Sequence, residues 1–167
     1  MERLGKLKHN LLLLIITFFG SGLISKKIPG TIGSLLATII LFFIPKSPSI
    51  VLIFAIASFI IGWICCELYI PKYETNKDPG YIVVDEACGI FLGAAIIYSF
   101  NFITPVAIIL NFLFFRVFDI WKPFPIRNIE KTLSSYDKTV SLGIMLDDIL
   151  AAIFGSTVQV AFLNLLG

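Results

Sequence analysis

Charged residues are scarce in this sequence of 167 residues, where aspartate, glutamate, lysine and arginine together make up 14%. Hydrophobic residues make up 57%, and the mean hydropathy is +0.95. Soluble domains are normally about a quarter charged, because polar side chains must cover their surface. The composition therefore argues against a soluble all-helical domain and predicts an integral membrane protein. The net charge of +2 is too small to indicate nucleic-acid binding, and we expect none.

Histidine and cysteine are also rare. The single histidine, His9, lies in the N-terminal segment, where we expect no catalytic role, so no Ser-His-Asp triad is plausible. The three cysteines lie in apolar runs with no metal or redox spacing, and we interpret them as packing residues. Cys88 does not begin the Cys-x5-Arg pattern of cysteine phosphatases, because Ala94 stands at the arginine position.

Several signatures of phosphate chemistry are missing as well. The sequence contains no P-loop of the form Gly-x4-Gly-Lys-Ser/Thr. It also lacks the Asp-x-Asp of aspartate-nucleophile phosphatases and the Asp-Gly-x2-Ala-Arg of CDP-alcohol phosphotransferases. Any phosphate chemistry must therefore come from a different arrangement of acidic and basic residues.

Apolar runs divide the chain, which we expect to form a single domain over residues 1–167. The N-terminal run has the order of a signal peptide, but no A-x-A-like cleavage site follows, so we expect it to be retained. A membrane-spanning helix needs roughly 20 apolar residues. Residues 11–24 fall short of this, and we expect them to form an interfacial or re-entrant helix. The predicted fold is all-α and polytopic, with about five further apolar helices at 31–45, 50–71, 87–100, 105–118 and 142–166.

The distribution of charge predicts how these helices are oriented. Lysine and arginine in short loops favour the cytoplasmic side of a membrane. If residues 11–24 do not cross, one arrangement of the five helices places every basic residue except Lys46 on one side. The same arrangement places every acidic residue at a cytoplasmic helix end or in a cytoplasmic loop. We therefore expect a charged, metal-binding layer where the membrane meets the cytoplasm.

Two pairs of acidic residues adjoin apolar helices, Asp85-Glu86 and Asp147-Asp148. Burying a carboxylate is costly unless a partner compensates its charge. Carboxylates from neighbouring helices can hold Mg²⁺, which also takes phosphate oxygens as ligands and activates water. The alternative for any of these acids is a solvated helix end near the lipid head groups. The full candidate set is Glu67, Asp78, Asp85, Glu86, Asp119, Asp147 and Asp148.

Two further segments could contact phosphate. In residues 29–34, PGTIGS, the amides of a helix start could bind an anion, with Lys27 just before them. An ordinary helix start capped by Thr31 or Ser34 is an equal alternative. In residues 115–126, FRVFDIWKPFPI, Arg116 could bind a phosphate bidentately and Lys122 could add a charge. The same segment suits a basic-aromatic membrane anchor, and the two interpretations are compatible.

With these segments identified, the sequence resembles the phosphatidylglycerophosphatase A family. The resemblance extends over most of the chain and implies a Mg²⁺-dependent enzyme of the bacterial inner membrane. Such an enzyme converts phosphatidylglycerophosphate, an anionic phospholipid, to phosphatidylglycerol and phosphate in phospholipid biosynthesis. The matching blocks are SGLISKKIPGTIGS (21–34), DPGYIVVDE with the following Ala-Cys-Gly (78–89), FRVFDIWKPFPI (115–126) and GIMLDDILAAI (143–153).

The resemblance and the residue chemistry together predict the roles of the site residues. The alternatives are a divalent-cation transporter or channel, whose acids should recur along a pathway through the membrane, and a phosphatase of another phosphate ester. The sequence leaves open whether water or a carboxylate attacks the phosphate, and it leaves the oligomeric state open. The predicted metal ligands are Asp85, Glu86, Asp147 and Asp148; the catalytic acids are Asp78, Asp85 and Asp119; and the substrate contacts are Lys27, Thr31, Ser34, Arg116 and Lys122.

Overall fold

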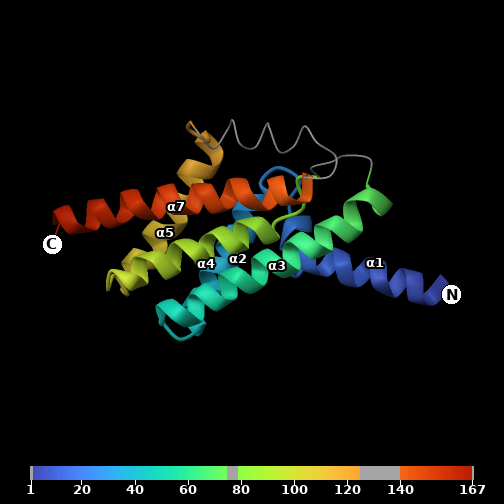
Figure 1. Cartoon of the computed structure of the whole chain (residues 1–167), viewed down its shortest axis with the longest axis horizontal. Helices are drawn as coiled ribbons and strands as arrows, with labels where there is room; N and C mark the ends of the chain where they lie inside the picture. The colour runs from blue at the N-terminus through green and yellow to red at the C-terminus, as the bar shows by residue number, and fades with distance from the viewer. Residues whose placement is uncertain (1, 75–78, 125–139, 167) are drawn as a thin grey trace.

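The structure, a computed structural model, describes residues 2–74, 79–124 and 140–166. Within these ranges the chain is helical and has no β-strand, so the all-α prediction is confirmed. Figure 1 shows the helices as an elongated bundle with the two termini at opposite ends. The elements are α1 (Glu2–Ile16), the 3-10 turn η1 (Ser21–Leu23), α2 (Pro29–Phe43), α3 (Pro48–Tyr73), α4 (Val84–Ser99), α5 (Pro105–Trp121) and α7 (Val140–Leu166).

Proline and threonine set the starts of several helices. Pro29, Pro48 and Pro105 occupy the first turns of α2, α3 and α5, where a missing N–H costs nothing. The Thr104 hydroxyl oxygen also accepts a hydrogen bond of 3.1 Å from the amide of Ala107. The expected break between two apolar helices near residues 101–105 is confirmed, because α4 ends at Ser99 and α5 begins at Pro105.

The N-terminal segment differs from the expected apolar helix over residues 11–24. Helix α1 begins in the charged region at Glu2 and already ends at Ile16. A turn with positive φ at Phe18, Phe19 and Gly20 follows and leads into η1. The Thr17 hydroxyl stabilises this end of the helix by donating a 2.7 Å hydrogen bond to the carbonyl of Leu13.

Helix α4 is the centre of the bundle. It packs against α3, α7, α2 and α5, and most of its side chains are buried. Two buried side-chain amides form hydrogen bonds between the helices of the bundle. Asn111 on α5 donates to the carbonyl of Ile90 on α4 at 3.0 Å, and Gln159 on α7 donates to the carbonyl of Ala107 on α5 at 2.8 Å. Such interhelical hydrogen bonds suit an apolar environment that offers no water as a partner.

Two helices, α3 with 26 residues and α7 with 27, are long and apolar enough to cross a membrane by length and composition. At 1.5 Å per residue each is about 40 Å long, which exceeds the roughly 30 Å of a bilayer core. The apolar helix α2 has only 15 residues. The prediction of about five membrane-crossing helices is therefore supported for two of them by length and composition, and the full number stays a prediction.

Close packing at Gly33 yields a first prediction. A Cβ atom at Gly33 would lie 2.7 Å from the Cβ of Val83, just before α4, so Gly33→Ala forces these backbones apart. Overpacking of this kind typically costs about 1–3 kcal/mol, and we expect a lower thermal midpoint in detergent. The control is Gly5→Ala, because no atom lies within 4 Å of that position. An equal midpoint for the two variants would contradict the α2–α4 contact described here.

Candidate active site

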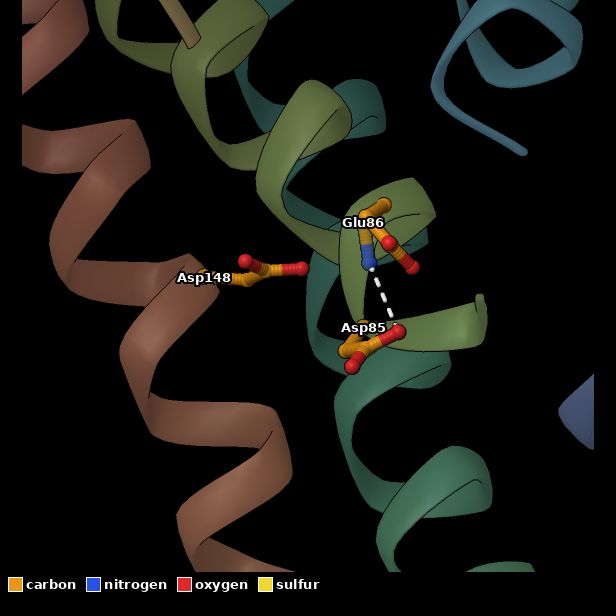
Figure 2. A group of neighbouring side chains, drawn as sticks. All are labelled: Asp85, Glu86 and Asp148. Carbon is orange, nitrogen blue, oxygen red and sulfur yellow. Dashed lines mark hydrogen bonds between the residues drawn. The ribbon is translucent and has the colours of Figure 1, made fainter. Parts of the chain in front are cut away.

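Three carboxylates from two helices meet near the start of α4. Asp85 and Glu86 occupy the first turn of α4, and Asp148 extends from α7 toward them (Figure 2). One oxygen from each side chain lies within 4.8 Å of the others. The structure thus brings together three of the four predicted metal ligands, although Asp148 lies more than sixty residues after the other two in the chain. We call these residues the acidic triad.

The acidic triad is largely withdrawn from water. Asp85 is 8% exposed and Asp148 is 3% exposed. The amide of Glu86 donates a 3.0 Å hydrogen bond to Oδ1 of Asp85. The buried Oε2 of Glu86 has no hydrogen-bond partner among the described residues. Buried carboxylates repel one another and need compensation, so this donor set, made entirely of carboxylate oxygens, fits a hard divalent cation such as Mg²⁺.

Helix α5 brings a basic and an acidic residue to the acidic triad. Nη1 of Arg116 lies 2.5 Å from Oδ2 of Asp119, one turn further along the same helix. The Asp119 carboxylate is close enough to interact electrostatically with both Glu86 and Asp148. The buried Nε of Arg116 has no hydrogen-bond partner among the described residues. The predicted catalytic acid Asp119 and the predicted phosphate contact Arg116 therefore both adjoin the acidic triad.

The fourth predicted ligand, Asp147, lies beside the acidic triad. Its Oδ2 forms an ion pair of 2.6 Å with Nζ of Lys122, which follows the last turn of α5. Asp147 also interacts electrostatically with Asp148. Its role as a metal ligand, and the role of Lys122 as a phosphate contact, stay predictions. The ion pair itself connects α5 to α7 at the edge of the site.

Helix α2 approaches the site through Gly30. A side chain at Gly30 would collide with Oε1 of Glu86 and would lie 3.2 Å from Nη1 of Arg116. Glycine at this position leaves room for the Glu86 carboxylate as it stands, and the sequence analysis did not single out Gly30 as a site residue. Its position in PGTIGS, a segment expected to bind an anion, was the available signal.

The other predicted contacts on this segment differ in exposure. Ser34 is fully buried, and its hydroxyl donates to the carbonyl of Gly30 at 2.7 Å. Thr31 is half-buried in the first turn of α2, and Lys27 is exposed. The alternative of a cap by Thr31 or Ser34 is wrong, because Ile28 is the N-cap and forms no side-chain capping bond.

The segment before α4 is held in place by backbone and side-chain contacts. The amide of Val83 donates to the carbonyl of Ile16 at 2.9 Å, which joins this segment to the end of α1. The Tyr81 hydroxyl donates to the Glu74 carboxylate, and burial together with this bond raises the pKa of Tyr81. The predicted catalytic residue Asp78 lies outside the described residues. The candidate acid Glu67 is exposed on α3 and does not belong to the acidic triad.

Known proteins resemble this chain over most of its length. The family model for phosphatidylglycerophosphatase A matches residues 14–163. A phosphatidylglycerophosphatase A of Haemophilus influenzae is 39% identical over 150 residues, which cover 89% of this chain and 86% of the relative. One of Escherichia coli K12 is 32% identical over 152 residues, covering 86% and 78%.

A third relative carries a different name. This Bacteroides thetaiotaomicron protein is 33% identical over 147 residues, covering 84% of this chain and 86% of the relative, and its name proposes a phosphatidylinositol-3-phosphatase. No solved structure matches the chain. Because the family model covers most of its length, the chain belongs to the phosphatidylglycerophosphatase A family of phosphatases.

Proposed function

We propose that this protein hydrolyses phosphatidylglycerophosphate to phosphatidylglycerol and phosphate in phospholipid biosynthesis, with Mg²⁺ as its cofactor. The observation that carries the proposal is the meeting of Asp85 and Glu86 from α4 with Asp148 from α7 in a member of this family. Three carboxylates this close together are suited to a metal-dependent phosphatase, because they can hold a cation beside a phosphate.

In this proposal Asp85, Glu86 and Asp148 hold the metal, and Asp147 adjoins them. The bound Mg²⁺ would supply charge neutralisation at the phosphate and activation of the attacking water. The uncompensated Oε2 of Glu86 supports this assignment, since a buried carboxylate oxygen without a hydrogen bond is costly unless a cation binds it.

Basic groups from α5 would bind the substrate phosphate. Arg116 offers a guanidinium group beside Glu86, and Lys122 adds a positive charge at the edge of the site. The first turn of α2, near Thr31, adds amide donors, and Lys27 precedes it. These groups would stabilise the charge that develops on the phosphate oxygens in the transition state. Asp119, fixed by its ion pair with Arg116, would orient the water or accept its proton.

The arrangement of charge supports a multi-pass protein whose site faces the cytoplasm. The acidic triad lies at the end of the bundle where α4 begins and α5 ends. Apolar side chains such as Ile53 on α3 and Ile109 on α5 are exposed, as expected for a lipid-facing surface. On α1, exposed Leu4, Leu7 and Leu11 form a stripe next to basic residues, which supports an interfacial position.

A divalent-cation transporter or channel is the competing function of another class. Its acids should line a pathway through the membrane. Here the acidic triad lies at one end of the helices, and Arg116 and Lys122 accompany it. These basic side chains suit an anionic substrate better than a metal cation in transit.

The name of the Bacteroides relative makes phosphatidylinositol 3-phosphate the appropriate comparison substrate.

The direct test of the function is phosphate release by purified protein in detergent micelles. With Mg²⁺ we expect release from phosphatidylglycerophosphate, and EDTA should abolish it because the carboxylates then lack their cation. Restoring Mg²⁺ should restore activity. Phosphatidylinositol 3-phosphate should react more slowly. Protein that releases no phosphate from either lipid under any of these conditions would defeat the proposal.

Removing one carboxylate of the acidic triad tests the metal assignment. Asp85→Asn and Asp148→Asn should each lower kcat/KM by more than about 100-fold, since losing even an outer-sphere partner of a metal ligand typically costs 10- to 100-fold. Thermal midpoints should stay near that of the wild type, which separates chemistry from folding. The control is Glu67→Gln, an exposed acid outside the triad, which should retain wild-type kinetics. Wild-type rates for Asp85→Asn would remove Asp85 from the mechanism.

Gly30→Ala tests the close approach of α2 to the acidic triad. The new methyl group should displace the Glu86 carboxylate, which can rotate at small cost, so the fold should persist. We expect the Mg²⁺ concentration needed for half-maximal rate to rise several-fold. Gly80→Ala is the matched control, since no atom lies within 4 Å of its Cβ position. An unchanged Mg²⁺ requirement for Gly30→Ala would show that Glu86 does not hold the metal.

A further inference from the structure

An apolar groove lies between α3, α4 and α7. Its volume is about 390 Å³, within the range of roughly 300–1,000 Å³ that is usual for ligand sites. Every side chain that lines it is apolar or a cysteine. The lining includes Leu52, Ile56 and Ile60 on α3, Cys88 and Leu92 on α4, and Ile149 on α7.

One end of the groove comes within a helical turn of the acidic triad on α4. Cys88 follows Asp85 by about one helical turn on the same side of α4. Ile149 directly follows Asp148 on α7. The thiol of Cys88 donates to the carbonyl of Ala55 at 3.4 Å, which brings α3 against α4 at this point. The helices that supply the acids therefore also form the near end of the groove.

The groove then leads away from the charged end of the bundle. On α4 it runs from Cys88 to Leu92, away from the helix start that carries the acids. On α3 it runs from Ile60 back to Leu52, a rise of about 12 Å along the helix. Phosphate chemistry near one end and an apolar groove that leads away from it match a molecule with a charged head and an apolar tail.

We propose that one acyl chain of the lipid substrate binds in this groove while the phosphate lies at the acidic triad. The inference rests on the proposed function, because it requires a lipid phosphate ester as substrate. Close packing of acyl methylenes against Leu52, Ile56 and Leu92 supplies van der Waals contacts at a distance from the reacting phosphate. It also fixes the depth of the phosphate relative to Asp85 and Asp148.

A second apolar groove, of about 270 Å³, lies between α1 and α3. It is lined by Leu14, Phe18, Phe54, Ala57 and Ile61, with further residues of the same two helices and the turn between α1 and η1. Only Val84 in this lining comes from a helix that carries an acid of the triad, whereas Cys88, Leu92 and Ile149 of the first groove all do. The groove between α3, α4 and α7 is therefore the one assigned to the substrate.

The test compares tryptophan substitutions at the groove with one outside it. Ile56→Trp and Leu92→Trp introduce a bulky ring from opposite walls, and Ile53→Trp places the same ring on an exposed position of α3 that lines neither groove. Each protein is assayed with dipalmitoyl and dihexanoyl phosphatidylglycerophosphate in the same mixed micelles. Both groove variants should lose at least about fivefold in kcat/KM for the dipalmitoyl lipid, mainly through KM, because several methylenes lose their van der Waals contacts. They should keep wild-type values for the dihexanoyl lipid, as Ile53→Trp should for both.

Equal losses on the two lipids, or no loss in either groove variant, would overturn the assignment of the groove. The proposed function would then still stand, because it depends on phosphate release by the wild type. If the wild type releases no phosphate from either lipid, the function and the groove are both overturned, and the two failures are thereby distinguished.

Photo-crosslinking gives a second measurement that does not depend on turnover. A phosphatidylglycerophosphate with a diazirine in its acyl chain should label Leu52, Ile56, Ile60 or Leu92 in the wild type. Excess unlabelled phosphatidylglycerophosphate should remove these adducts, and excess neutral lipid should not. Adducts concentrated at Ala57 and Ile61 would assign the chain to the other groove. That result would overturn the proposal.

Discussion

Repulsion among buried carboxylates is the constraint on which the rest of this structure depends. Asp85, Glu86 and Asp148 lie close together at the end of a bundle that is otherwise apolar. Like charges withdrawn from water are costly, and a protein keeps them only where a cation or a chemical role compensates the cost. The positive end of the α4 dipole lowers this cost in part, because two of the acids lie in its first turn. The negative charge that remains uncompensated makes the site suitable for a divalent metal.

Close packing around α4 holds these groups in position. Small residues let neighbouring helices approach: Gly30 faces Glu86, and Gly89 faces the ring of Phe115 on α5. The hydrogen bond from Val83 to Ile16 fixes the segment that leads into α4. The ion pair between Lys122 and Asp147 fixes α5 against α7 on the other side of the site. Each contact joins segments that are distant in the chain, so the geometry of the site is a property of the whole bundle.

The separation of polar and apolar surface explains how such a site serves a membrane substrate. The charged groups gather where α4 begins, whereas the long helices α3 and α7 present apolar side chains over most of their length. A lipid phosphate can therefore reach the acids without its chains leaving an apolar environment. The groove between α3, α4 and α7 continues this separation along the apolar surface of the bundle. The charged groups that would act on the phosphate and the apolar groove are therefore adjacent but separate.

The sequence by itself determined the helical architecture and the residue types of the site. Long apolar runs broken by proline and short polar loops admit few structures other than helices, and acids beside such runs need a partner, so Asp85, Glu86 and Asp148 could be recognised in advance. Only the tertiary structure decided which acids meet. Asp147 and Asp148 are adjacent in sequence, yet a rotation of about 100° per residue on α7 directs one toward Lys122 and the other toward Asp85. The end of α1 at Ile16 and the approach of Gly30 to Glu86 likewise depend on contacts between distant segments, which no local pattern of residues encodes.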